Sequence, residues 1–64
     1  MSSVRAVIAK AFPFSRIAVL RTEDGRWLGL TRYAQGFEAI ELRVGVWLAC
    51  DLPEKGACVV AVRS

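Results

Sequence analysis

Hydrophobic residues alternate with small or polar ones along most of this chain, with a period of two. Because successive side chains of a strand point to opposite faces, this pattern predicts β-strands, and helical spacing is scarce. Turn signals divide the alternating stretches at Pro13, at Asp24 and Gly25, and at Pro53–Gly56. The predicted strands cover residues 4–12, 16–22, 26–33, 44–52 and 57–63.

Residues 34–42, between the third and fourth predicted strands, interrupt the alternation. Gly36 ends the strand pattern, and Phe37 and Ile40 follow at near-helical spacing, which predicts one helical turn or a loop covering one end of a sheet. Five short strands with this connection favour an all-β fold, a small closed antiparallel barrel, because closure removes exposed sheet edges. The position of the irregular connection favours the oligonucleotide/oligosaccharide-binding (OB) topology over an SH3-like barrel. Residues 1–64 form a single domain.

The outward side of this barrel follows from its core residues. Leu28 and Leu30 of the third strand and Ala18 and Leu20 of the second are expected to point inward. The outward residues of these two strands are then Ile17, Val19, Arg21, Trp27, Gly29, Thr31 and Tyr33. Lys10 and Phe12 could join them from the first strand. This surface is the best candidate for a binding face.

The aromatic residues have alternative interpretations. Trp27 could cap one end of the barrel, and Tyr33 could pack under the loop at Gly36 and Phe37. Phe12 and Phe14, on either side of Pro13, are predicted as core residues that anchor a loop. Trp47 alternates with Leu48 and points away from the core, on a side of an OB barrel away from the usual binding face. It is therefore either covered by a terminus or loop, or it contacts another chain.

The charge of the chain favours an anionic partner. Nine Lys and Arg residues stand against six Asp and Glu, a net charge of +3, and seven of the nine are arginine. Arginine binds phosphate through its planar fork and stacks on bases, although a surface arginine is often only a solubilising charge. The predicted nucleic-acid-binding residues are Lys10, Arg16, Arg21, Trp27, Thr31, Arg32 and Tyr33.

The layout resembles the cold-shock domain and the OB-fold of the smallest bacterial translation initiation factor over nearly the whole chain. The matching residues are Gly36 and Phe37, Leu42 with Gly45, Lys55 and Gly56 in a turn, and Ala57 leading the last strand. These residues build the fold, so the resemblance implies the architecture more than the function. It implies a module that binds single-stranded RNA or DNA on the first three strands.

The base-stacking residues of that family are missing at the expected places. Family members carry K-G-[FY]-G-F on the second strand and an aromatic residue with histidine on the third. This chain has Ser15–Val19 and Leu28–Thr31 there. With Ile17 and Val19 outward, the platform is aliphatic, which suits a protein surface or a nucleic acid held mainly by its phosphates. A homodimer or a protein-interaction subunit using Ile17, Val19 and Trp47 is therefore the alternative function.

Catalysis and metal binding have little support in the sequence. The chain has no histidine, no glycine-rich phosphate loop and no evident carboxylate pair, so we expect no enzyme, cofactor or metal site. Cys50 and Cys58 flank the last turn, where a disulfide is conceivable, but reduced thiols packed as small hydrophobes are favoured. No signal peptide and no apolar run of about 20 residues is present, which favours a cytoplasmic protein.

Overall fold

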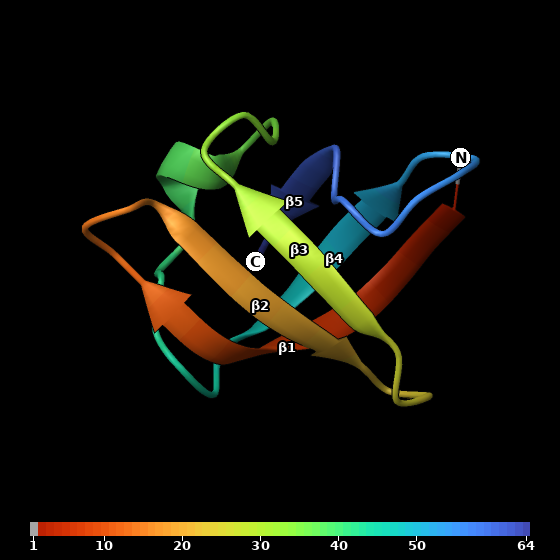
Figure 1. Cartoon of the computed structure of the whole chain (residues 1–64), viewed down its shortest axis with the longest axis horizontal. Coiled ribbons are helices and arrows are strands. Elements are labelled where there is room, and N and C mark those ends of the chain that lie inside the picture. The colour runs from red at the N-terminus through yellow and green to blue at the C-terminus, as the bar shows by residue number, and fades with distance from the viewer. Residues whose placement is uncertain (1) are drawn as a thin grey trace.

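The strands form one five-stranded sheet in the order β3-β2-β1-β4-β5, and every neighbouring pair is antiparallel (Figure 1). The computed structural model describes residues 2–64. Its elements are β1 (Ser2–Phe12), β2 (Ile17–Thr22), β3 (Trp27–Thr31), the 3-10 turn η1 (Phe37–Ala39), β4 (Trp47–Leu52) and β5 (Ala61–Arg63).

β1 belongs to both halves of the sheet. Its first half pairs with β4, from Ser2 opposite Leu52 to Val7 opposite Trp47. Its second half pairs with β2, from Ala6 opposite Thr22 onward. Because the neighbour changes along β1, the sheet curls, and β2 and β3 cross in front of β4 in Figure 1.

The free edges of the sheet meet through two short parallel bridges. The amide of Gly29 in β3 donates to the carbonyl of Ala57 at 2.8 Å, and the amide of Val59 donates to the carbonyl of Gly29 at 2.9 Å. Further along, the amide of Gln35 donates to the carbonyl of Val60 at 2.9 Å. These contacts bring β3 beside the segment that leads into β5. The result is the small OB-like β-barrel that the sequence predicts.

The core lies inside this curl and has the inward residues that the period-two pattern predicts. Ala18, Leu20, Leu28 and Leu30 are all buried. The other core residues are Ala6, Ile8, Ala34, Phe37, Leu48, Cys50, Leu52, Val59 and Val62. The predicted helical turn exists as η1, whose first residue, Phe37, is buried and closes the core at that end.

Four strands are shorter than predicted, β2 by one residue and the other three by more. β3 ends at Thr31, where the amide of Ala34 bonds the Thr31 carbonyl and turns the chain. β4 begins at Trp47, because residues 43–46 form a turn in which the Val46 amide bonds the Arg43 carbonyl. β5 covers only Ala61–Arg63, since the preceding residues pair with Gly29 across the closure.

A β-bulge in β1 reverses the side on which its last residues lie. The pairing with β2 shifts between Ile8 and Lys10, which leaves Ala9 as the extra residue. An inserted residue moves every later side chain to the other face. Lys10 and Phe12 therefore face outward. The prediction that Phe12 and Phe14 are core residues is wrong: Phe12 is 48% exposed and Phe14 is fully exposed.

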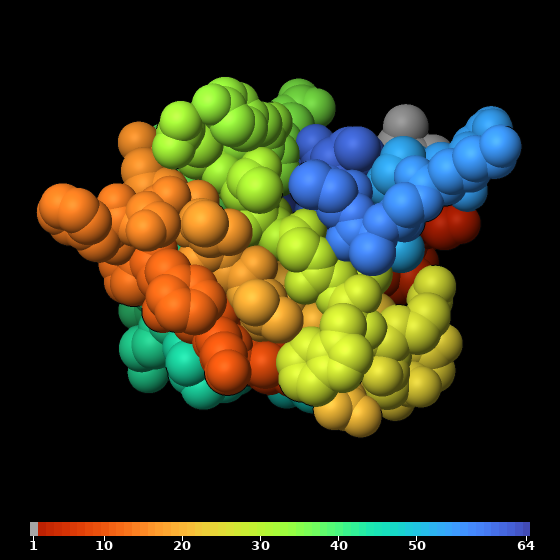
Figure 2. Space-filling view, viewed as in Figure 1, coloured from red at the N-terminus to blue at the C-terminus, as the bar shows by residue number. Residues whose placement is uncertain are grey.

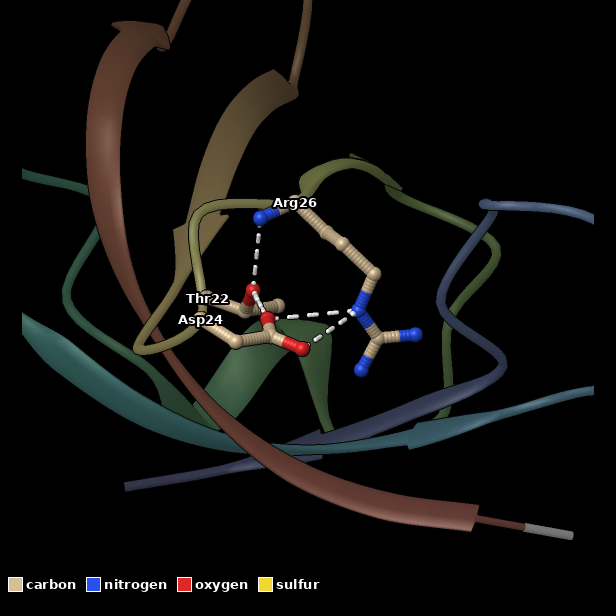
Figure 3. A network of polar contacts seen from close by, with 3 residues as sticks. All are labelled: Thr22, Asp24 and Arg26. Atoms are coloured by element: carbon tan, nitrogen blue, oxygen red, sulfur yellow. Dashed lines mark hydrogen bonds and ion pairs between the residues drawn. The ribbon is translucent and has the colours of Figure 1, made fainter.

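The predicted hairpin turn between β2 and β3 is held by a polar network (Figure 3). The Thr22 hydroxyl donates to the Asp24 carboxylate and accepts a hydrogen bond from the Arg26 amide at 2.9 Å. The guanidinium of Arg26 donates to both Asp24 oxygens at 3.2 Å. Gly25 completes the turn with a φ of 91°, a conformation that favours glycine. Thr22, the buried polar residue of the described chain, is thus fully partnered.

Candidate nucleic-acid interface

The outer face of β1–β3 is a grid of three cross-strand rows, set by the register of the strands. The rows are Val7, Arg21 and Trp27; Lys10, Val19 and Gly29; and Phe12, Ile17 and Thr31. Residues directly opposite one another in antiparallel strands have their side chains side by side on the same face. Figure 2 shows this face toward the viewer, as a continuous surface coloured from orange to yellow-green.

Two flat aromatic side chains are exposed on this face, at its opposite ends. Trp27 is 54% exposed and Phe12 is 48% exposed. Between them lie the smaller side chains of Val19 and the backbone of Gly29, both half-buried. A base needs a flat, accessible ring for stacking, and each of these residues offers one.

The guanidinium of Arg21 lies over the Trp27 ring, 4.6 Å from its centroid. The two residues are direct cross-strand neighbours, so the stack follows from the β2–β3 register. A cation over an indole face is attracted by the negative potential of the ring. Trp27 is exposed. It therefore does not cap one end of the barrel, which was the alternative interpretation.

Ion pairs divide the basic residues into two groups. Four arginines are bound to carboxylates: Arg16 to Glu38, Arg26 to Asp24, Arg43 to Glu41 and Arg63 to Asp51. Among the described residues, the basic side chains outside these pairs are Arg5, Lys10, Arg21, Arg32 and Lys55. Strands β1–β3 contain no Asp or Glu. The positive charge of Lys10 and Arg21 on this face is therefore not neutralised by a carboxylate from the same strands.

The predicted site residues separate in the structure. Lys10, Arg21, Trp27 and Thr31 share the outer face of β1–β3. Arg16 does not: it lies in the β1–β2 turn with a φ of 58°, bound to Glu38, and its guanidinium is 5.7 Å from the Phe37 ring. It points to η1 and not to the outer face.

Arg32 and Tyr33 lie just beyond β3 and form a pair of their own. Arg32 stacks on the Tyr33 ring at 4.8 Å and donates a hydrogen bond to its hydroxyl at 2.9 Å. Tyr33 is 80% exposed, so the alternative in which it packs under the loop at Gly36 is wrong. Thr31 accepts a hydrogen bond from the Tyr33 amide at 3.3 Å, which links the pair to the end of the face.

The predicted aliphatic patch is present but is not isolated. Ile17 is exposed and Val19 half-buried, as the alternation predicts. Ile17 lies directly opposite the exposed Phe12. The patch is therefore mixed, aromatic and aliphatic. Of the two sequence interpretations of Phe12, a core residue beside Pro13 or an outward residue of the first strand, the structure has the second.

The two cysteines differ in environment. Both are free thiols; Cys50 is buried in the core as predicted, whereas Cys58 is exposed and not packed as a small hydrophobe. Burial raises the pKa of the Cys50 thiol, and the Asp51 carboxylate adds to that effect. Within residues 2–64, no group of three or more Cys, Asp or Glu side chains is arranged to hold a metal ion.

Comparison with known proteins adds no assignment: no family model, curated protein or solved structure matches this chain. In the part of the chain described, no helix is long and apolar enough to cross a membrane.

Proposed function

We propose that this protein is a binding module for single-stranded nucleic acid, RNA or DNA, that uses the outer face of β1–β3. The observation that supports the proposal best is the combination on this one face of exposed Trp27 and Phe12, cationic Lys10 and Arg21, and no carboxylate from the same strands. Phosphates require the cations and bases require the rings. The resemblance to the cold-shock domain in fold-building residues adds support.

Different residues of this face would bind the phosphates and the bases. Lys10 and Arg21 would contact phosphates, with Arg32 extending the positive charge past the end of β3. Trp27 would stack on one base through the ring surface that Arg21 leaves open, and Phe12 on another. The half-buried Gly29 between them presents no side chain, so the strand can approach the sheet closely. Here the stacking rings lie at the two ends of the face and not at the positions of the cold-shock motifs.

A salt titration of matched charge variants tests the proposal. Binding of a labelled single-stranded oligonucleotide is measured by anisotropy for the wild type and for Lys10→Ala, Arg21→Ala and Lys55→Ala. Each lost phosphate contact should reduce the slope of log K against log salt by about 0.7. Lys55 is the control, because it carries the same charge but lies in the turn between β4 and β5.

The expected result is weaker binding and a smaller salt slope for Lys10→Ala and Arg21→Ala, with Lys55→Ala close to the wild type. Equal losses in all three variants would indicate attraction by net charge alone. No binding by the wild type at low salt and micromolar protein would refute the proposal.

A second function is favoured by one observation, the apolar side chains at the β1–β2 end of the face. Phe12 and Ile17 are exposed cross-strand neighbours, and the fully exposed Phe14 lies in the turn beside them. Clustered exposed apolar residues are typical of protein contacts. A homodimer or a protein-interaction subunit that uses this end would be seen by light scattering as self-association or as binding of a second protein. It should be abolished by Phe14→Ser and insensitive to nuclease.

A further inference from the structure

A fourth strand continues one row of the outer face. In the β1–β4 register Val7 lies opposite Trp47, and in the β1–β2 register the same Val7 lies opposite Arg21. The row Trp27, Arg21, Val7 and Trp47 therefore crosses β3, β2, β1 and β4 in that order. Neighbouring strands are about 4.8 Å apart, so the backbones at its two ends are separated by about 14 Å along the sheet.

The two ends of this row have the same chemistry. Trp47 is 44% exposed, and the guanidinium of Arg5 lies 5.6 Å from its ring centroid. At the other end Arg21 lies over the exposed Trp27 in the same way. Each end thus combines an accessible indole with an arginine that forms no ion pair within residues 2–64. Trp47 is not covered by a terminus or a loop in the described chain, in contrast to one of the sequence interpretations.

The charges near Trp47 are mixed, and Arg5 is the cation there that stands outside the ion pairs of residues 2–64. The acidic residue of β4, Asp51, is bound to Arg63 at 3.3 Å. Glu23 and Asp24 line a pocket of about 350 Å³ together with Arg5, but neither forms an ion pair with it. The row itself carries Arg21 and no carboxylate, and Arg5, two residues before Val7 in β1, lies beside it over the Trp47 ring. A phosphate backbone that follows the row would meet cations at both ends.

We propose that the nucleic-acid path extends from Trp27 across Arg21 and Val7 to Trp47, which stacks on a further base while Arg5 contacts a phosphate. This inference rests on the proposed nucleic-acid function. It enlarges the site from three strands to four and sets a minimum ligand length. An oligonucleotide of about three nucleotides should occupy one end of the row, whereas one of about ten should reach both ends.

Two variants, each with a single tryptophan, test whether the nucleic acid reaches both ends of the row. Trp47→Phe leaves Trp27 as the sole indole, and Trp27→Phe leaves Trp47. Each is titrated with oligothymidylates of about three and about ten nucleotides, and tryptophan fluorescence is recorded. The short ligand should quench Trp27 alone, because the outer face of β1–β3 adds Lys10 and Phe12 only at that end, and the long ligand should quench both residues.

Affinity provides the second measurement. Trp47→Ala should weaken binding of the long oligonucleotide by roughly tenfold and leave the short one unchanged, because the stacking contact of one base is lost. Trp47→Phe retains a ring and should recover most of that loss. Urea unfolding of each variant controls for a loss of stability.

Each outcome separates the two proposals. If oligonucleotides of both lengths quench the fluorescence of Trp27 but not that of Trp47, the extended path is refuted and the three-strand site remains. If neither tryptophan responds and no oligonucleotide binds, the proposed function itself fails. If the wild type self-associates without nucleic acid and Trp47→Ala abolishes this, Trp47 is a protein contact and the path is refuted.

Discussion

Of the glycines in this chain, we expect Gly36 to cause the largest loss in the free energy of unfolding when it is replaced. Its φ is 88°, where an L-residue pays about 1–2 kcal/mol. A Cβ at this position would also lie 2.1 Å from the carbonyl oxygen of Val62, a backbone atom that cannot rotate away. Gly36→Ala must therefore push the loop before η1 away from β5.

The magnitude follows from the contacts that this movement breaks. Gln35 donates to the Val60 carbonyl at 2.9 Å and accepts from the Val62 amide at 2.8 Å, which are the bonds that join the loop to β5. Loss of two such bonds costs about 1–3 kcal/mol in total. With the φ penalty, Gly36→Ala should lower the free energy of unfolding by about 2–5 kcal/mol. A chain of this length has only about 3–10 kcal/mol in all.

Gly45→Ala is the matched control. Gly45 has a similar φ of 94°, but a Cβ there would have no atom within 4 Å. Its replacement should cost only the conformational penalty, about 1–2 kcal/mol. Urea unfolding followed by tryptophan fluorescence measures both variants, and the difference between them isolates the clash with Val62. Equal losses in the two variants would refute the argument that close approach to β5, and not backbone conformation alone, demands glycine at position 36.

Three further predictions concern stability and reactivity. Hydrogen bonds from Thr22 and then Arg26 lower the pKa of Asp24 below its ordinary value of 3.8, so this carboxylate stabilises the folded state above about pH 4 and stops doing so as the pH falls through the lowered pKa. Asp24→Asn should therefore flatten the loss of urea stability on acidification; an unchanged pH profile would contradict this. A thiol reagent should modify Cys58 in the native protein and Cys50 only on unfolding, as mass spectrometry would show; equal rates would be the contrary result. Leu20→Ala should cost about 2–5 kcal/mol in urea unfolding and exposed Val60→Ala much less, and similar losses would argue against the core assignment.

The period-two pattern was sufficient for the architecture because it is a local signal. Leu28 and Leu30 inward, with Trp27 outward, follow from alternation within a single strand, and each is found as predicted. The helical turn at Phe37 was also visible in the sequence, since a glycine and a change of spacing precede it. The outer face of β1–β3 could be predicted from the same alternation.

Two features that the sequence interpretation did not foresee depend on contacts between distant residues. The bulge at Ala9 lies in the pairing of β1 with β2 and places Phe12 on the outer face, whereas its position beside Pro13 had suggested a core residue that anchors a loop. Arg16 was counted with the binding residues, yet Glu38, 22 positions later in the chain, binds it. The spacing of residues along the sequence does not indicate which distant charges will form an ion pair.

The sequence alone predicted a small OB-like barrel, the inward residues of its second and third strands, and tryptophan and arginine on its outside. These properties are encoded by hydrophobic alternation and turn residues within each short segment. The folded structure was needed to see which arginines lack a carboxylate partner among residues 2–64 and that Trp27 and Trp47 lie on one row. Both depend on strand register, which is set when segments far apart in the sequence pair and pack.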